Sequence, residues 1–558
     1  MGLRRLLIIE TQSLNKLKNF KILIFDEYLK HLLNFEGKSE EKYQYYYSIN
    51  FLKKRNYYSS ELLRKMKIYR RELTKCLNKI HNKNFSEKYW GILIDQVIFY
   101  TLNQIIIELP LLRKIKKQHP KIHIQKVRFN NFYDNTFDFV NSNQFDNKQS
   151  FTRFMIARFL NYSETQTKTV NKFKKKKEKD NLKSKLFRFF FRNYVKIFNC
   201  NLVIDSYLGA KRDLIIFLKS FGRILCIPSK FFFNYEKKII NKNQFLRNQI
   251  IVNERDIVDK TFNFLIKDFL PASFVEDFKN FYEEGRKFKN ISVIGSAVAA
   301  INNDYYKFIA AEILKNRGKL ISLQHGGFLD KKKKSFNLNI FEKKYISKTF
   351  LWSGKNSIKD FFFRIKKENK IRLKENYEIL IYPTNNIINF NFKYAPFRKF
   401  HPKINQYFEF FYYLNSNLKR KVKIKPMQNN ISNIFKNNFK KKFNIKNNIF
   451  INGDKNILSK YKIVIINDLS TPIYELLYLR IPFIVIDDEI QNLNKVTDKK
   501  IKDLKKINVL FNSPKRASIF LNENYENINI WWETVLKSKI FKDLNNDLMP
   551  MNKNYKSL

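Results

Sequence analysis

The sequence predicts an α/β fold with two facing Rossmann-like domains and a helical elaboration in its first half. Short apolar segments without polar alternation recur along the chain, as expected for parallel strands that helices cover on both faces. Residues 463–487 contain the clearest unit, in which two such segments flank a helical one. The length of 558 residues suffices for two or three domains with full-sized cores.

A first series of strands is predicted in the N-terminal half. It comprises Leu6–Ile9, Lys21–Phe25, Leu202–Ile204, Ile224–Ile227, Ile291–Ile294 and Leu320–Leu323. Between the second and third of these, residues 40–198 carry helical patterns such as Ser59–His81, which predict a helical insertion. We therefore expect residues 1–345 to form one Rossmann-like domain that contains this insertion.

A second series of strands follows a junction at residues 346–376. It comprises Ile379–Tyr382, Val422–Ile424, Ile449–Ile451, Ile463–Ile466, Phe483–Ile486 and Val509–Phe511. These strands and their helical spacers predict a second Rossmann-like domain over residues 377–528. The tail, residues 529–558, begins with a helical pattern, and its paired Trp531 and Trp532 are expected to dock that helix.

The chain is strongly basic, with 108 Lys plus Arg against 50 Asp plus Glu and a net charge of +58. The charge is spread along the sequence, and Asn, Ile, Phe and Tyr are enriched with Lys, as AT-rich codons would produce. No RNA-recognition, zinc-finger or helix-turn-helix pattern accompanies it, so a nucleic-acid partner is not expected. Residues 172–198 join a lysine run to an aromatic helical pattern. This segment predicts either a solvated loop followed by a core helix or a patch that contacts an anionic membrane.

The expected compartment is the cytoplasm, with peripheral contact at the inner face of the membrane as an option. Cys76, Cys200 and Cys226 are widely spaced and form no CxxC pair, which favours a reduced protein. The N-terminal apolar run is too short for a signal-peptide core. The longest apolar tract, Trp90–Leu112, is interrupted by polar residues and predicts a buried helix rather than a membrane span.

The first candidate site is the sequence Gln324-His325-Gly326-Gly327, directly after the predicted Leu320–Leu323 strand. The preceding segment, Ala310–Gly318, predicts a helix with a glycine C-cap. His325 would therefore lie at the carboxyl end of a strand. An imidazole there can move a proton or brace a phosphate, and the two glycines let the backbone approach an anion. The alternative is a turn that carries an incidental histidine.

The second candidate site is the loop Asp468–Thr471 between the Ile463–Ile466 strand and the next helix. Ser470 or Thr471 can cap that helix, and Pro472 suits its first helical position. A diphosphate at this helix start would meet free N–H groups and a favourable dipole, with Glu475 one turn further on. In the alternative interpretation, these residues only cap the helix and bond the turn.

Lys423 and Lys425, at and just after a strand end, form a weaker third candidate, because a lysine there could neutralise phosphate. Asp487-Asp488 lacks the DxD spacing of metal-dependent sugar transferases, so no metal is expected. The chain contains no GxxxxGK[ST], GxGxxG or GxSxG sequence. We therefore expect no cofactor, and ATPase, NAD-dependent and serine-hydrolase functions lack their motifs.

Several of these segments resemble a family of transferases found among bacterial surface-polysaccharide and lipopolysaccharide assembly proteins. The likeness runs nearly end to end. It includes Leu6–Lys30, SEKYWGILI at Ser86–Ile94, FLPASFVEDF at Phe269–Phe278, ISLQHGG, LWSG at Leu351–Gly354, the 463–487 unit and the two tryptophans of the tail.

The resemblance implies a glycosyltransferase-B-like architecture, with an acceptor-side first domain and a nucleotide-donor second domain. It implies that His325, Gly326 and Gly327 line the cleft and that Asp468–Thr471 with Glu475 forms the donor loop. Glu342 is implied as the other catalytic candidate. Expected partners are a nucleotide-sugar donor and a glycan or lipid-linked acceptor.

Three other functions stay open. The same fold serves transferases of phosphoalcohol units from CDP-glycerol-type donors, and it serves sugar-nucleotide epimerases. A non-catalytic basic protein that binds membrane or nucleic acid would need no cleft chemistry.

Overall fold

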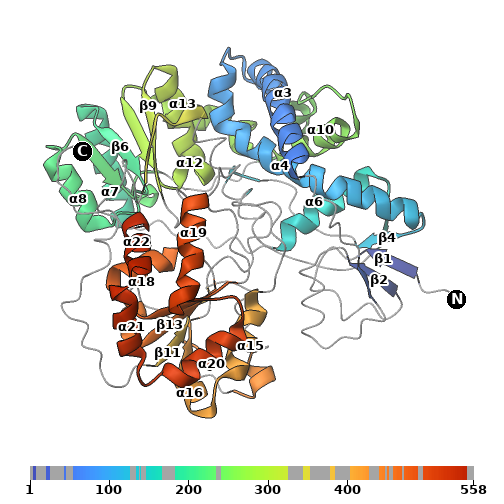
Figure 1. Ribbon diagram of the computed structural model, residues 1–558. Helices are drawn as coiled ribbons and strands as arrows, with labels where there is room; N and C mark the ends of the chain where they lie inside the picture. Colours follow the sequence, from blue (N-terminus) through green and yellow to red (C-terminus); the bar gives the residue numbers. More distant parts are fainter. Residues whose placement is uncertain are drawn as a thin grey trace.

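Figure 1 shows the computed structural model, in which three parallel sheets are each accompanied by helices. The structure describes residues 4–7, 20–24, 43–45, 55–125, 133–136, 139, 146–165, 182–233, 241–324, 344–351, 378–383, 403–425, 436, 439–445, 449–451, 457–467, 471–487 and 494–548. The mixed α/β class predicted from the sequence is confirmed.

The first sheet has the order β3-β2-β1-β4-β5, and all of its neighbouring strands pair in parallel. Its strands are β1 (Arg4–Leu7), β2 (Phe20–Ile24), β3 (Tyr43–Tyr45), β4 (His123–Gln125) and β5 (Ser163–Thr165). The order reverses between β1 and β4, because the chain first moves outward through β2 and β3 and then returns to the other side of β1.

The second sheet has the order β10-β9-β8-β6-β7 and is also parallel. Its strands are β6 (Asn201–Ile204), β7 (Ile224–Ile227), β8 (Val293–Ser296), β9 (Lys319–Leu323) and β10 (Lys348–Phe350). Counted along the chain, this is the doubly wound order 2-1-3-4-5, which reverses between β6 and β8.

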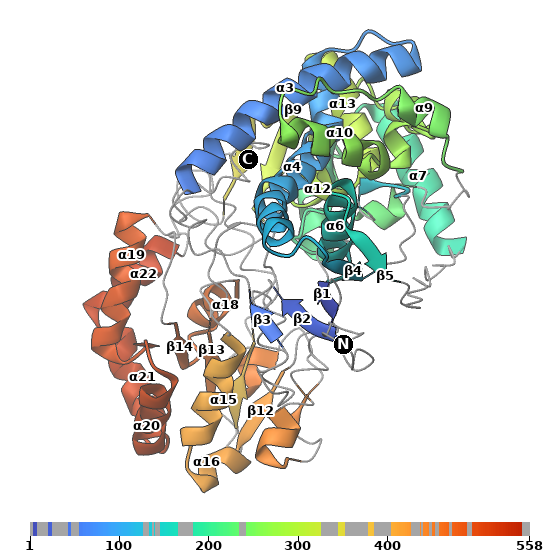
Figure 2. The ribbon, with the colours of Figure 1, turned by 90° about the vertical axis from the view of Figure 1, so that its right-hand side faces the viewer.

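The third sheet repeats that order as β12-β11-β13-β14-β15, with parallel pairing throughout. Its strands are β11 (Ile379–Ile381), β12 (Val422–Ile424), β13 (Ile463–Ile466), β14 (Phe483–Ile486) and β15 (Leu510–Phe511). The reversal lies between β11 and β13. In both Figure 1 and Figure 2 this sheet and its helices form a unit below α10 and α13, and the strands of the first sheet lie beside its upper part.

Helices occupy much of the described chain. They are α3 (Arg55–His81), α4 (Glu87–Gln118), α6 (Asp146–Phe159), α7 (Leu182–Phe198), α8 (Ala210–Lys219), α9 (Gln244–Asn248), α10 (Ile257–Phe269), α11 (Phe278–Arg286), α12 (Ala299–Asn302), α13 (Asp304–Lys315), α15 (Lys403–Tyr413), α16 (Ser416–Arg420), α18 (Thr471–Leu479), α19 (Lys495–Asp503), α20 (Pro514–Asn524), α21 (Ile528–Lys537) and α22 (Lys539–Leu548).

Helices cover both faces of the third sheet, which explains its unalternating apolar strands. Val464 and Ile466 pack with α18, α19, α21 and α22 on one face. Ile463 and Ile465 pack with α15, α16 and α20 on the other. All four residues of β13 are therefore buried.

The long helix α4 is the core of the helical region. It is long and apolar enough to cross a membrane, but 94% of its most apolar window is buried inside the protein. Its side chains pack against α3, α10 and α11 in one hydrophobic cluster. The predicted buried helix at Trp90–Leu112 is thus confirmed.

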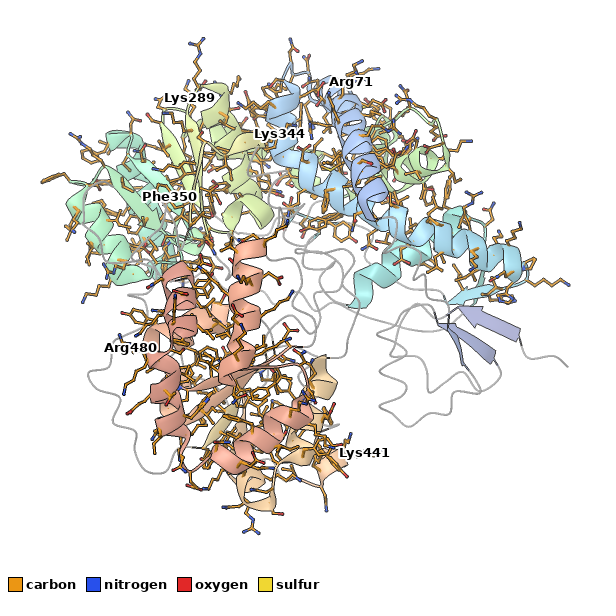
Figure 3. All side chains as sticks on the ribbon, in the orientation of Figure 1. Arg71, Lys289, Lys344, Phe350, Lys441 and Arg480 are labelled. Atoms are coloured by element: carbon orange, nitrogen blue, oxygen red, sulfur yellow. The ribbon has the colours of Figure 1, made fainter. Side chains whose placement is uncertain are left out.

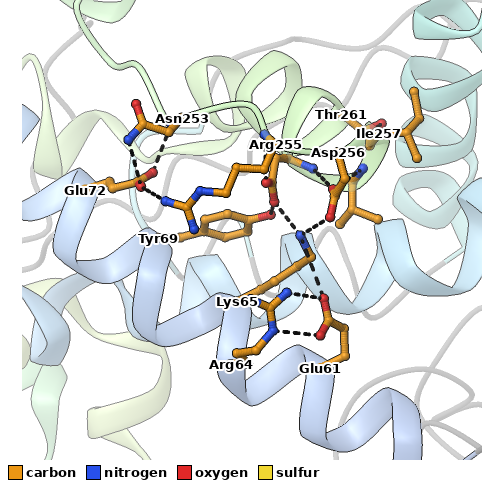
Figure 4. Close-up of polar contacts among 12 residues, drawn as sticks. Glu61, Arg64, Lys65, Tyr69, Glu72, Asn253, Arg255, Asp256, Ile257 and Thr261 are labelled. Atoms are coloured by element: carbon orange, nitrogen blue, oxygen red, sulfur yellow. Dashed lines mark hydrogen bonds and ion pairs between the residues drawn. The ribbon is translucent and has the colours of Figure 1, made fainter.

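Charged groups join α3 to the start of α10 (Figure 4). The buried Lys65 ammonium contacts Asp256 Oδ2 at 2.7 Å and Asp259 Oδ1 at 2.5 Å, and the Tyr69 hydroxyl donates to the same Asp259 oxygen. Because the Lys65 side chain is buried, its two carboxylate partners compensate the loss of hydration. These bonds fix α3 against α10.

Strand positions agree closely with the sequence prediction, but their grouping differs from it. The first predicted series is divided between two sheets, and residues 40–198 supply β3, β4 and β5 to the first sheet as well as helices. Ile449–Ile451 forms only an isolated bridge, from Phe450 to Ile424. The domain boundaries themselves stay a prediction.

Two local predictions need correction. The helix before β9 ends in a left-handed turn at Arg317 rather than at a glycine, and the Gly318 N–H then bonds to the Ile313 carbonyl. The aromatic helix at the end of residues 172–198 is α7, and most of its apolar side chains are exposed rather than in a core.

The tail docks as expected. The Trp532 indole is buried, donates to the Arg480 carbonyl at 2.8 Å and meets the Phe483 ring edge-on. The neighbouring Trp531 donates to the Ile507 carbonyl. Both indoles therefore hold α21 against the third sheet.

Candidate functional site

In doubly wound sheets, ligands bind beyond the carboxyl ends of the strands at the point where the strand order reverses. In the third sheet this point lies between β11 and β13. The residues that directly follow these strands and their neighbour β12 are Tyr382, Asn467 and Lys425. They define the candidate donor site.

Lys425 and Tyr382 lie together at this edge. The Lys425 ammonium donates to the Tyr382 hydroxyl at 3.2 Å and lies 4.6 Å from the centre of its ring. The Lys425 N–H bonds to the Ile381 carbonyl, which extends the strand pairing by one residue. A partly exposed cation is thereby held beside the reversal point, where it could meet a phosphate. The structure places this predicted residue at the edge of the sheet where β13 also ends.

The buried side-chain amide of Asn467 follows β13, the strand next to β11. Asn467 is fully buried, and its Oδ1 accepts a hydrogen bond from the Tyr407 hydroxyl at 2.6 Å. The same hydroxyl also lies 3.2 Å from the Tyr382 carbonyl. Tyr407 therefore ties the ends of β11 and β13 together. Sequence reasoning missed this group, although a polar residue that ends an apolar strand is a usable signal.

Helix α18 begins at Thr471, shortly after the buried Asn467. Pro472 is buried and is the second residue of the helix, one position later than predicted, and Glu475 is half-buried one turn further on. Asp468 and Ser470 lie outside the described residues. Of the predicted donor loop, the structure thus describes Thr471 and Glu475 on the first two turns of the helix that follows β13.

A second group of polar residues follows β6, at the reversal point of the second sheet. Asp205 and Tyr207 both adopt left-handed backbone conformations, with φ of 51° and 62°. Such conformations cost free energy in residues with side chains and often mark functional sites. The Asp205 carboxylate accepts the Ser229 N–H at 2.8 Å, and the Ser206 hydroxyl donates to Asp213 at 2.6 Å. The sequence analysis did not single out this turn.

The predicted QHGG site follows β9, which is the neighbour of β8 and lies two strands from β6. The Gln324 N–H donates to the carbonyl of Phe350, which Figure 3 labels on β10, and Gln324 is buried. His325, Gly326, Gly327 and Glu342 lie outside the described residues. The structure therefore places only the strand that leads into this sequence.

The SEKYWGILI segment holds the helix that precedes β9. The Ser86 side chain caps α4, and the Tyr89 hydroxyl donates to Glu312 of α13 at 2.9 Å. Gly91 has no room for a side chain, because a Cβ would lie 2.0 Å from the Tyr345 hydroxyl. That hydroxyl instead donates to the buried Asp95 at 2.7 Å. The contacts of this segment therefore indicate a structural role, which is to pack α4 against α13 and Tyr345.

The FLPASFVEDF segment reaches the same helix from another direction. The Ser273 hydroxyl donates to Asp304 at the start of α13 at 2.5 Å. The buried Lys307 ammonium lies 3.7 Å from Asp304 and donates to Thr136, and burial lowers the pKa of Lys307 to about 8. Helix α13 is thus fixed on several sides, and it leads directly into β9 and the QHGG sequence.

A half-buried histidine in this junction makes the stability pH-dependent. His81 Nε2 lies 3.0 Å from the Phe274 carbonyl, and the imidazole stacks on Phe278. Burial lowers the pKa of His81 to about 4 from 6.5. Between these values the unfolded chain binds a proton that the folded chain does not. The contribution of His81 to the free energy of unfolding therefore falls by about 1.4 kcal/mol per pH unit as the pH drops from 6.5 to about 4.

We expect His81→Gln to remove this slope, because glutamine can donate to the same carbonyl without titrating. The measurement is denaturant unfolding of both proteins between pH 7 and pH 4.5. The difference between their free energies of unfolding should change by about 3 kcal/mol at most over that range. If the free energy of unfolding changes with pH in the same way for both proteins, His81 is not the source of the pH dependence.

Among the described residues, no group of three or more His, Cys, Asp or Glu side chains is placed to hold a metal ion. Asp487, which follows β14, is buried, and its N–H bonds to the Phe511 carbonyl. Asp488 lies outside the described residues.

Three doubly wound parallel sheets, two of them with polar residues at their reversal points, define an α/β protein of the Rossmann-like class. The chain belongs to the LIC12162 family of transferases, whose family model matches residues 7–545. A search of curated proteins found no match. The transferase class expected from the sequence is confirmed at the level of this family.

Proposed function

We propose that the protein is a glycosyltransferase that moves a sugar from a nucleotide-activated donor to a surface-polysaccharide or lipopolysaccharide precursor. The observation that carries the proposal is the third sheet, in which Lys425 and the start of α18 meet the reversal point between β11 and β13. A cation and a helix N-terminus at the same edge of a parallel sheet suit a diphosphate. The family adds the transferase class.

In this proposal the second and third sheets correspond to the two domains of a glycosyltransferase-B-like enzyme, and their shared 2-1-3-4-5 order supports the correspondence. The donor diphosphate would lie against Asp468–Thr471 and Lys425, with Glu475 nearby. The helix dipole and the ammonium would stabilise the leaving charge as the sugar bond breaks. The reaction would take place in the cytoplasm, with a glycan or lipid-linked acceptor.

His325 would act from the second sheet, with Gly326 and Gly327 allowing close approach to an anion. It would either deprotonate the acceptor hydroxyl or brace the phosphate, and Glu342 is the other candidate base. Helix α13 supports this assignment, because its many contacts fix the direction of β9, which leads into His325.

The first experiment is a thermal-shift screen of nucleoside diphosphates and their sugars, with CDP-glycerol included. Stabilisation by one nucleotide class would identify the donor, since a ligand that binds only the folded state raises the melting temperature. Product analysis then separates glycosyl transfer from phosphoalcohol transfer and from epimerisation. A chain that responds to none of these ligands would contradict the proposal.

Lys425→Met tests the donor site directly. We expect affinity for the stabilising nucleotide to fall about tenfold, because a charge-assisted hydrogen bond to phosphate is lost. Lys423→Met is the matched control. Lys423 lies on the same strand, but its ammonium is 3.6 Å from Glu378, which precedes β11 at the amino end of that strand. Isothermal titration should show unchanged affinity for this control, and equal losses in both variants would refute the site.

A further inference from the structure

Helix α7 presents apolar side chains to solvent along one face. The exposed apolar residues are Leu182, Leu186, Phe187, Phe189, Phe190, Ile197 and Phe198. Leu182, Leu186, Phe189, Phe190 and Ile197 fall on one stripe of the helix at spacings of three, four and seven residues. Val195, on a different face of the helix, is buried against the second sheet. The fold therefore uses the face that carries Val195, and it leaves the exposed apolar stripe uncovered.

The apolar surface continues onto α8. The Tyr194 ring lies 5.6 Å from Phe217 of α8 and 4.7 Å from Phe198, and its hydroxyl donates to the Gly222 carbonyl. Leu214 and Leu218 of α8 are exposed as well. Figure 1 shows α7 and α8 together beside the second sheet, far from α10. We call these exposed residues of the two helices, with Phe221, the α7–α8 face.

Phe221 is the most exposed large apolar residue described, at 93%. It occupies the left-handed position after α8, with φ of 50°, where glycine is usual. The turn is otherwise regular, because the Gly222 N–H bonds to the Phe217 carbonyl and the Phe221 N–H to the Leu218 carbonyl. A phenylalanine at this position strains the backbone and buries no apolar surface. Phe221 therefore destabilises the folded state rather than stabilising it.

The charged residues of α7 are all basic, namely Lys183, Lys185, Arg188, Arg192 and Lys196. Arg188 is buried and Arg192 pairs with Glu284, so neither belongs to the exposed face. Lys185 and Lys196 are exposed on one flank of the apolar stripe. On α8, Lys211 and Lys219 are exposed, and its one acid, Asp213, accepts a hydrogen bond from Ser206.

From the apolar stripe and its basic flank, we propose that the α7–α8 face binds the surface of an anionic lipid bilayer. Apolar rings would enter the boundary between headgroups and acyl chains, and the flanking lysines would meet lipid phosphates. A second copy of this chain fits less well, because a symmetric contact would place basic flanks against each other. The inference does not depend on the identity of the donor, and it would bring the enzyme to a lipid-linked acceptor.

The test uses the full chain and vesicle flotation. We expect it to float with phosphatidylcholine vesicles that contain about one third phosphatidylglycerol and to bind pure phosphatidylcholine at least tenfold more weakly. Binding should weaken as salt is added.

Phe221→Gly separates membrane contact from folding. Glycine suits the left-handed position, so we expect the melting temperature to stay the same or rise, while vesicle affinity falls about tenfold. Phe245→Ser is the matched control, since Phe245 is an exposed ring on α9, which contacts α10, and α10 lies far from α7 and α8 in Figure 1. This control should float like the wild type.

Lys185→Glu with Lys196→Glu should abolish the preference for anionic vesicles, whereas Lys537→Glu with Lys539→Glu on α21 and α22 should leave it unchanged. The nucleotide-induced thermal shift should survive in all of these variants, so a failure of the donor site is distinguishable. The proposal is overturned if the wild type ignores anionic vesicles or if Phe221→Gly floats as well as the wild type. It is also overturned if ultracentrifugation shows a dimer that the face variants dissociate while no vesicle binding occurs.

Discussion

Replacement of His325 by alanine is expected to lower turnover roughly a hundredfold or more while the protein stays folded. General acid–base catalysis by a placed side chain contributes about this factor, and electrostatic bracing of a phosphate contributes a comparable one. The residue follows β9 by two positions, and that strand is held between β8 and β10. The measurement is steady-state transfer with the donor found in the nucleotide screen.

The two roles for His325 predict different kinetics. If the imidazole deprotonates the acceptor, kcat falls, the low-pH limb of its pH profile changes, and nucleotide affinity is unaffected. If it braces phosphate, nucleotide affinity falls too. Glu342→Gln tests the other base, and His119→Ala at the end of α4 is a control that should keep full activity. Wild-type turnover in His325→Ala would remove this residue from the mechanism.

Replacement of Arg247 by methionine is expected to destabilise the protein by about 3–5 kcal/mol, because it leaves a buried carboxylate without its counter-charge. The Arg247 guanidinium is fully buried and binds both oxygens of Glu276, at 2.6 and 2.8 Å. It also donates to the carbonyls of Lys267 and Leu270 at the end of α10. These carbonyls have no partner within the helix and would lose their bond as well.

Arg64→Met is the matched control for this prediction. Arg64 also binds both oxygens of a glutamate, Glu61, at 2.9 and 2.8 Å, but its side chain is 57% exposed (Figure 4). Removing an exposed pair is expected to cost less than about 1 kcal/mol. Denaturant unfolding of both variants compares the two, and adding Glu276→Gln to Arg247→Met should restore part of the loss. If both variants lose the same free energy of unfolding, burial of the ion pair does not determine the loss.

Apart from β10, the strands of the second and third sheets could be predicted because their sequences carry a strong signal. A strand covered on both faces must be apolar at every position, as in Ile463–Ile466, and such a run is unfavourable in a loop or on a helix that faces water. β4, β5 and β10 were missed because each has three residues, most of them polar. β3 was missed for the same reason of length.

The candidate site was predictable only in part. Lys425 and Thr471 could be assigned to strand and helix ends, because sequence position relative to a strand fixes the edge at which a residue lies. Tyr407 could not, since it reaches Asn467 from a helix 60 residues away. The left-handed turn at Asp205 and Tyr207 also has no clear sequence signal, since the residues around it are ordinary.

The sequence alone determined that this protein is an α/β chain with parallel strands, because strand period and helix capping are local properties of the chain. Its resemblance to a family of transferases rests on sequence motifs, which are local as well. Only the tertiary structure decided that the strands form three sheets, which of them flank each reversal point, and that α7 faces solvent instead of a core. The physical reason is that pairing and burial depend on which distant segments meet. An apolar stripe on α7 has the same sequence pattern whether a sheet or a membrane covers it.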